Sequence, residues 1–74
     1  MRTYKMPAAV YEAPDMESGF EILDQCSDIM ADYRAADFPV FPDSEPYVER
    51  MMAAGCTCEE AVDILLTMVR EEVA

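Results

Sequence analysis

The side chains that offer most chemistry in this sequence are its 16 aspartates and glutamates and its three cysteines. The chain has no histidine, which removes the commonest general base and the commonest metal ligand. Ser-His-Asp triads and histidine-containing zinc sites are therefore excluded. Carboxylates can catalyse when burial raises the pKa of one of them, but here the acids fall on the polar sides of the expected helices. We therefore expect no enzymatic activity, no catalytic residue and no cofactor.

The cysteines, Cys26, Cys56 and Cys58, make a poor disulfide framework because their number is odd. A structural zinc site needs four ligands, and three cysteines are too few, so we expect no metal. Cys26 and Cys58 are expected to be small buried apolar side chains, while a redox or metal role of Cys56 and Cys58 stays open. The absence of a disulfide framework favours a cytoplasmic location.

The charge of the chain is strongly one-sided, because 16 acids stand against 5 lysines and arginines and give a net charge of −11. Such an excess opposes the approach of nucleic acids and anionic membranes, so we expect neither as a direct partner. Acidic disordered chains are poor in apolar residues, whereas 53% of this sequence is hydrophobic. The sequence therefore predicts a small folded domain whose partner is basic.

Helical periodicity predicts a first helix over about residues 15–33. Asp15 after Pro14 competes for the N-cap with Ser18, which forms a capping box with Glu21. At about 100° per residue, the apolar side chains gather on one face, and they are Phe20 at its edge, Ile22, Leu23, Cys26, Ile29, Met30 and Tyr33. Five acids share about 80° of the opposite face, and we call them the acidic row: Glu17, Glu21, Asp24, Asp28 and Asp32.

Prolines interrupt the segments on both sides of this helix. Residues 1–14 contain Pro7 and Pro14 and lack a helical period, so we expect an extended arm, with Thr3–Met6 as a candidate strand. Residues 34–43 are expected to form a connector that covers one end of the core. A second helix over about 44–54 has Asp43 or Ser44 as its candidate cap and ends at Gly55.

Thr57 and Glu60 form a capping box that predicts a third helix over about 58–73. Its apolar positions cover about 200°, which is wider than one packed face requires. The surplus indicates either the central helix of the bundle or a helix that contacts neighbours on two sides, and a second subunit of a homodimer is one such neighbour. We thus expect an all-α fold, a small three-helix domain over 15–74 with an extended N-terminal arm and a C-terminal helix hairpin.

The segment from Val48 to Leu66 resembles the first two helices of a ubiquitin-associated domain, with a helix, a turn glycine, a capping threonine and a Glu-Glu-Ala second helix. It departs from that family at Ala54 and Cys56, which replace an apolar residue and an aromatic one, and no third helix follows. The resemblance therefore implies the helix hairpin and not ubiquitin binding.

The acidic row contains no interspersed lysine or arginine, whereas ordinary protein surfaces mix negative and positive charges. This difference favours a functional role for the row. We expect a small inhibitor that occupies the basic nucleic-acid-binding surface of a target protein. In size and charge it resembles the nucleic-acid-mimicking inhibitors of phages, such as anti-CRISPR and anti-restriction proteins. If a phage encodes the chain, the expected location is the host cytoplasm. A second patch of partner-binding acids is expected at Glu45, Glu49, Glu59, Glu60 and Asp63. The alternative is a dimerisation or adaptor module that binds a partner through an apolar, Met-rich surface.

Overall fold

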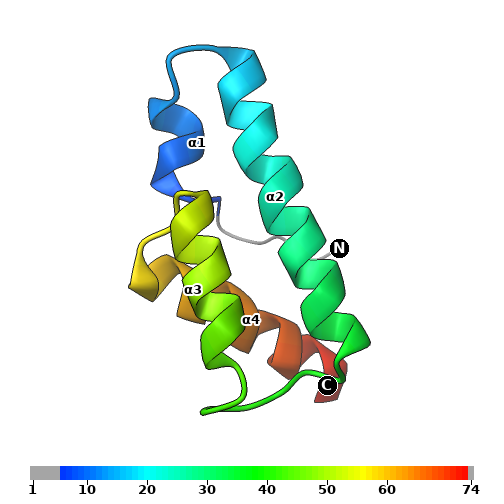
Figure 1. Ribbon diagram of the computed structural model, residues 1–74. Helices are drawn as coiled ribbons and strands as arrows, with labels where there is room; N and C mark the ends of the chain where they lie inside the picture. Colours follow the sequence, from blue (N-terminus) through cyan, green and yellow to red (C-terminus); the bar gives the residue numbers. More distant parts are fainter. Residues whose placement is uncertain (1–5, 74) are drawn as a thin grey trace.

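The computed structural model describes residues 6–73, which form four helices and no strand (Figure 1). The helices are α1 (Ala8–Glu12), α2 (Met16–Ala35), α3 (Glu45–Ala54) and α4 (Cys58–Val73). The all-α prediction is confirmed. None of the helices in these residues is both long enough and apolar enough to cross a membrane. The candidate strand at Thr3–Met6 falls outside the described residues except for Met6, which belongs to no regular element.

The expected extended arm contains a short helix instead, so the fold has four helices and not three. Pro7 carries a φ of −59°, which suits the start of a helix, and its carbonyl accepts a hydrogen bond from the Val10 N–H at 3.1 Å. Ala8 and Ala9 then favour helical backbone. Pro14 ends α1, because it drives the preceding Ala13 into extended conformation, with ψ at 144°. Two prolines that suggested an extended arm thus delimit one short helix.

Asp15, and not Ser18, caps α2. The Asp15 backbone is extended and its carboxylate accepts a hydrogen bond from the Ser18 N–H at 2.7 Å. This bond lowers the pKa of the Asp15 carboxyl below its ordinary value. The helix ends at Ala35, two residues beyond the expected end, and is followed by two residues with positive φ, Asp37 and Phe38. The Phe38 N–H donates to the Tyr33 carbonyl at 3.1 Å and so closes the end of the helix.

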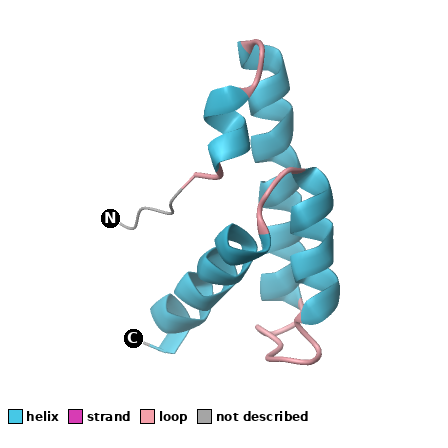
Figure 2. Cartoon of the chain, turned by 90° about the vertical axis from the view of Figure 1, so that its left-hand side faces the viewer, coloured by secondary structure: helices cyan, strands magenta, loops and turns pink. Residues whose placement is uncertain are grey.

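The core lies where α2, α3 and α4 meet, and Figure 2 shows α4 inclined away from the α2 and α3 pair. Met51 of α3 and Met68 of α4 are its largest fully enclosed side chains. Tyr33 closes one end of the core. Its ring lies edge-on to those of Phe38 and Tyr47, at centroid distances of 5.9 and 5.3 Å. The buried core residues are Cys26, Ile29, Tyr33, Met51, Ala54, Cys56, Ala61, Ile64, Leu65 and Met68.

Two glycines let α1 and the α3–α4 turn pack closely against α2. A Cβ at Gly19 would lie 3.2 Å from the Val10 carbonyl, so α1 reaches α2 only because that side chain is missing. Gly55 ends α3 with a φ of +125°, and a Cβ there would lie 3.3 Å from that of Ala9. As a result α1 and α3 lie end to end along one side of α2 (Figure 1).

The capping box of α4 also holds α1. The Glu60 N–H donates to Thr57 Oγ1 at 3.1 Å, and the Thr57 N–H donates to Glu60 Oε1 at 2.9 Å. The second oxygen of the same carboxylate, Oε2, accepts a hydrogen bond from the Ala8 N–H at 2.9 Å. One carboxylate therefore satisfies backbone donors at the start of two helices.

This double cap predicts that Glu60→Gln destabilises the protein. The substitution replaces one acceptor oxygen by an NH2 donor that faces a backbone donor, so we expect the free energy of unfolding to fall by about 1–2 kcal/mol. Urea unfolding followed by circular dichroism measures the change. Glu59→Gln is the matched control, because Glu59 is an exposed neighbour, and we expect it to shift stability by less than about 0.5 kcal/mol. Equal effects of the two variants would contradict the double cap.

Candidate functional site

The acidic row lies on the side of α2 that faces away from the core. All five of its side chains are exposed, while Cys26, Ile29 and Tyr33 of the same helix are buried. At about 1.5 Å of rise per residue, the row extends over about 22 Å. Its carboxylates are carried by one continuous helix of 20 residues, so their mutual spacing is fixed by the backbone.

One cation from another helix reaches the row at its C-terminal end. Arg50 of α3 donates a hydrogen bond to Asp32 Oδ2 at 2.8 Å, and both side chains remain about half exposed. No cation of residues 6–73 pairs with the other four members, Glu17, Glu21, Asp24 and Asp28. The sequence did not predict the Arg50 pair, because its two partners are 18 residues apart on different helices.

Apolar side chains border the N-terminal end of the row. Met16 is 75% and Phe20 55% exposed on α2, and Tyr11 of α1 is 76% exposed beside them. Met16 and Phe20 share a shallow hollow with three members of the row, Glu17, Glu21 and Asp24. The exposure of Phe20 could have been predicted from the sequence, because helical periodicity places this residue at the edge of the apolar face of α2. The row is therefore a mixed surface, with carboxylates along α2 and an apolar cluster at one end.

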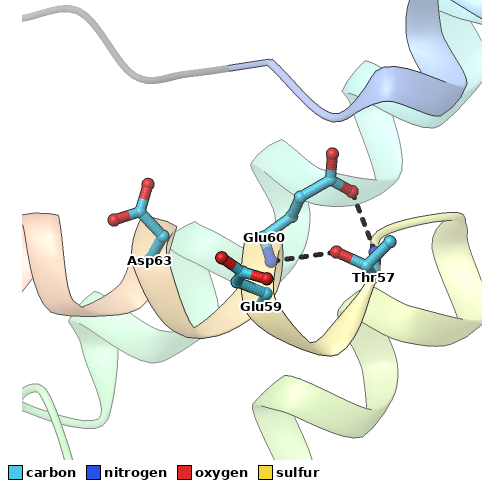
Figure 3. A pocket seen from close by; sticks show the side chains of 4 residues that line it. All are labelled: Thr57, Glu59, Glu60 and Asp63. Carbon is cyan, nitrogen blue, oxygen red and sulfur yellow. Dashed lines mark hydrogen bonds between the residues drawn. The ribbon is translucent and has the colours of Figure 1, made fainter.

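The five acids of the expected second patch fall into two groups. Glu59, Glu60 and Asp63 surround one depression at the start of α4, together with Thr57 (Figure 3). Glu60 differs from its neighbours there, because its half-buried carboxylate caps α4 and α1. Glu45 and Glu49 are exposed on α3 and line a separate groove.

The cysteines are arranged differently from expectation. Cys26 and Cys56 are both buried, with their Sγ atoms 3.8 Å apart in a thiol–thiol contact, whereas Cys58 is exposed. Cys58 was expected to be buried, and that prediction was wrong because the first residue of α4 faces the open groove. Burial, and then the neighbouring Cys26, raises the pKa of Cys56 to about 12, and burial also raises the pKa of Cys26. The buried pair is thus protonated and unreactive.

Residues 6–73 hold no group of three or more cysteines and carboxylates placed to bind a metal ion. What their carboxylates offer is a fixed array of negative charge with an apolar cluster at one end. Comparisons with protein-family models, curated proteins and solved structures find no match to this chain.

The burial of two thiols predicts selective alkylation of the native protein. N-ethylmaleimide should add once within minutes, at Cys58, while Cys26 and Cys56 react about 100-fold more slowly or only after unfolding. Intact-mass spectrometry counts the adducts, and Cys58→Ser should abolish the fast one. Two or three adducts forming at similar rates in the folded protein would contradict the buried pair.

Proposed function

We propose that this protein is a small inhibitor that binds the basic nucleic-acid-binding surface of a target protein through its acidic row. The observation that carries the proposal is the free state of Glu17, Glu21, Asp24 and Asp28, which no cation of the described residues neutralises. Negative charges three and four residues apart on a helix repel one another by a few tenths of a kcal/mol each. A complementary row of Arg and Lys on a partner removes that repulsion.

The dimensions of the row support mimicry of a nucleic acid strand. Steps of three and four residues separate successive carboxylates by about 4.5–6 Å along the helix axis. One DNA strand carries a phosphate about every 3.4 Å of axis. The row is therefore a sparser line of charge of similar kind, and a groove that follows a phosphate backbone with arginines and lysines meets about two acids for every three phosphates.

The apolar cluster of Tyr11, Met16 and Phe20 adds a second type of contact at one end of the row. Aromatic side chains carry much of the binding energy at protein interfaces, and nucleic-acid-binding surfaces present aromatic residues on which bases stack. Phe20 and Tyr11 are suited to such surfaces. The charge then provides attraction over distance, and the cluster provides a local anchor.

A target of this kind fits the setting in which small acidic inhibitors operate. Phage proteins that block host defence enzymes, including anti-CRISPR and anti-restriction proteins, have comparable size and charge. By this proposal the protein acts in the cytoplasm of the cell that contains the nucleic-acid-binding target, and contacts no nucleic acid or membrane itself.

The test is capture of partners from a nuclease-treated lysate of the native host cell, with the wild-type protein and the triple variant Glu21→Gln, Asp24→Asn, Asp28→Asn as baits. Three exposed charge contacts at about 0.2–1 kcal/mol each predict binding of the variant that is weaker by about 3-fold to 100-fold. Capture should also weaken between about 50 and 300 mM salt, because exposed charges are screened. Added duplex DNA should displace the captured protein.

A matched control removes three exposed acids outside the row, by Asp37→Asn, Asp43→Asn and Glu72→Gln. It has the same net charge as the triple variant, so it should retain wild-type binding within about twofold if the position of the charge matters. Unchanged capture by the triple variant, or a partner that duplex DNA fails to displace, would refute the mimicry.

A further inference from the structure

An open groove lies on another side of the molecule, between α3, α4 and the loop of residues 36–44. Its volume is about 780 Å³. We call it the α3–α4 groove. Its apolar lining includes Phe41, Val48, Met52, Val62, Leu66 and Val69. Arg50 of α3 reaches towards α2 and the acidic row, whereas Val48 and Met52 of the same helix line the groove. The two surfaces therefore lie on different sides of α3.

The groove collects most of the large apolar side chains that are left in solvent. Nine are exposed among residues 6–73, and five of them line the groove: Val40, Phe41, Met52, Val62 and Leu66. Phe41 is 77% exposed although its loop is held in place, since the Tyr33 hydroxyl donates a hydrogen bond to the Pro39 carbonyl at 2.7 Å. A contiguous apolar patch of this kind on a small protein marks an interaction site.

The breadth of the apolar face of α4 has its explanation here. Ala61, Ile64 and Met68 point into the core and are buried. Val62 and Leu66 face the groove instead, because they lie about 100° or more around the helix from the middle of this buried side. The second side on which α4 was expected to make contacts is thus open in the isolated chain.

The α3 edge of the groove is acidic, because Glu45 and Glu49 line it directly. On α4, Glu59 and Asp63 lie three residues before Val62 and Leu66, respectively, and they surround the separate depression at the start of that helix. An occupant therefore needs apolar side chains for the floor and positive charges on the flank that meets α3.

We propose that the α3–α4 groove binds an amphipathic helix of another protein, whose apolar face is flanked by lysines and arginines. The lining residues of α4 extend from Cys58 to Val69, about 16 Å along the axis, which matches about three turns of a bound helix. A second copy of this chain fits poorly, because it brings no excess of positive charge to Glu45 and Glu49 and joins two net charges of −11. The proposal is independent of the acidic row.

The probe is a dye-labelled 15-residue synthetic peptide with leucines at i, i+4, i+7 and i+11 and lysines and alanines elsewhere, followed by fluorescence anisotropy. Binding should weaken about 10-fold or more in Val62→Gln with Leu66→Gln. Glu45→Gln with Glu49→Gln should weaken it about 3-fold and flatten its salt dependence. A peptide of the same composition without the apolar period should bind at least about 10-fold more weakly.

The triple variant of the acidic row is the matched control and should bind the peptide within about twofold of wild type. Phe41→Ala changes the loop side of the groove and should also weaken peptide binding. It keeps the test valid if the Val62→Gln and Leu66→Gln variant unfolds, as judged by the loss of its helical circular dichroism. Equal peptide binding by wild type, by the Val62→Gln and Leu66→Gln double variant and by Phe41→Ala overturns the proposal. A loss of binding confined to the acidic-row variant also overturns it. A dimer in sedimentation at 50 μM that Leu66→Gln converts to a monomer overturns it as well, by assigning the groove to a second copy.

Discussion

The arrangement of the helices depends on the carboxylate of Glu60, whose two oxygens accept backbone N–H groups at the start of α4 and of α1. Helix α1 has only five residues, too few to be stable by itself, so it depends on contacts to the rest of the chain. The Glu60 bond supplies one of them, and the close approach of Val10 to Gly19 supplies another. The same residue closes the capping box at the first turn of α4, directly after the turn at Gly55. Its carboxylate therefore joins the starts of two helices that are far apart in the sequence.

Local signals in the sequence were sufficient for the parts of the fold that depend on neighbouring residues. Asp15 and the Thr57–Glu60 box mark helix starts, and Gly55 marks an end, because each acts within one helical turn. The same holds for the acidic row, which follows from spacing along one helix. Helix α1 was missed because two prolines seven residues apart suit a short helix as well as an extended arm, and the bond from Ala8 to Glu60 spans 52 residues.

The features that sequence reasoning missed share a dependence on how separate helices meet. Cys56 lies in a turn, where no helical period orients its side chain, and its burial follows from its contact with Cys26 of α2. The expected second patch was divided because α3 and α4 turn Glu45 and Glu59 towards different surroundings. The groove itself was foreshadowed by the 200° apolar face of α4, but its walls come from three segments. Composition gave the amount of charge and apolar surface, and tertiary packing distributed both.

The ion pair between Asp32 and Arg50 makes the two ends of α2 unequal. At the N-terminal end the carboxylates are unpaired and stand beside Met16 and Phe20, whereas at the C-terminal end the last carboxylate is already matched. A phosphate backbone repeats the same charge at every step and looks alike to a protein that slides along it. The exposed surface of α2, in contrast, differs between its two ends in charge pairing and in apolar content. Under the proposed function, a partner that recognises both ends would be held in one orientation and one register, and would lose the freedom to slide that a nucleic acid allows.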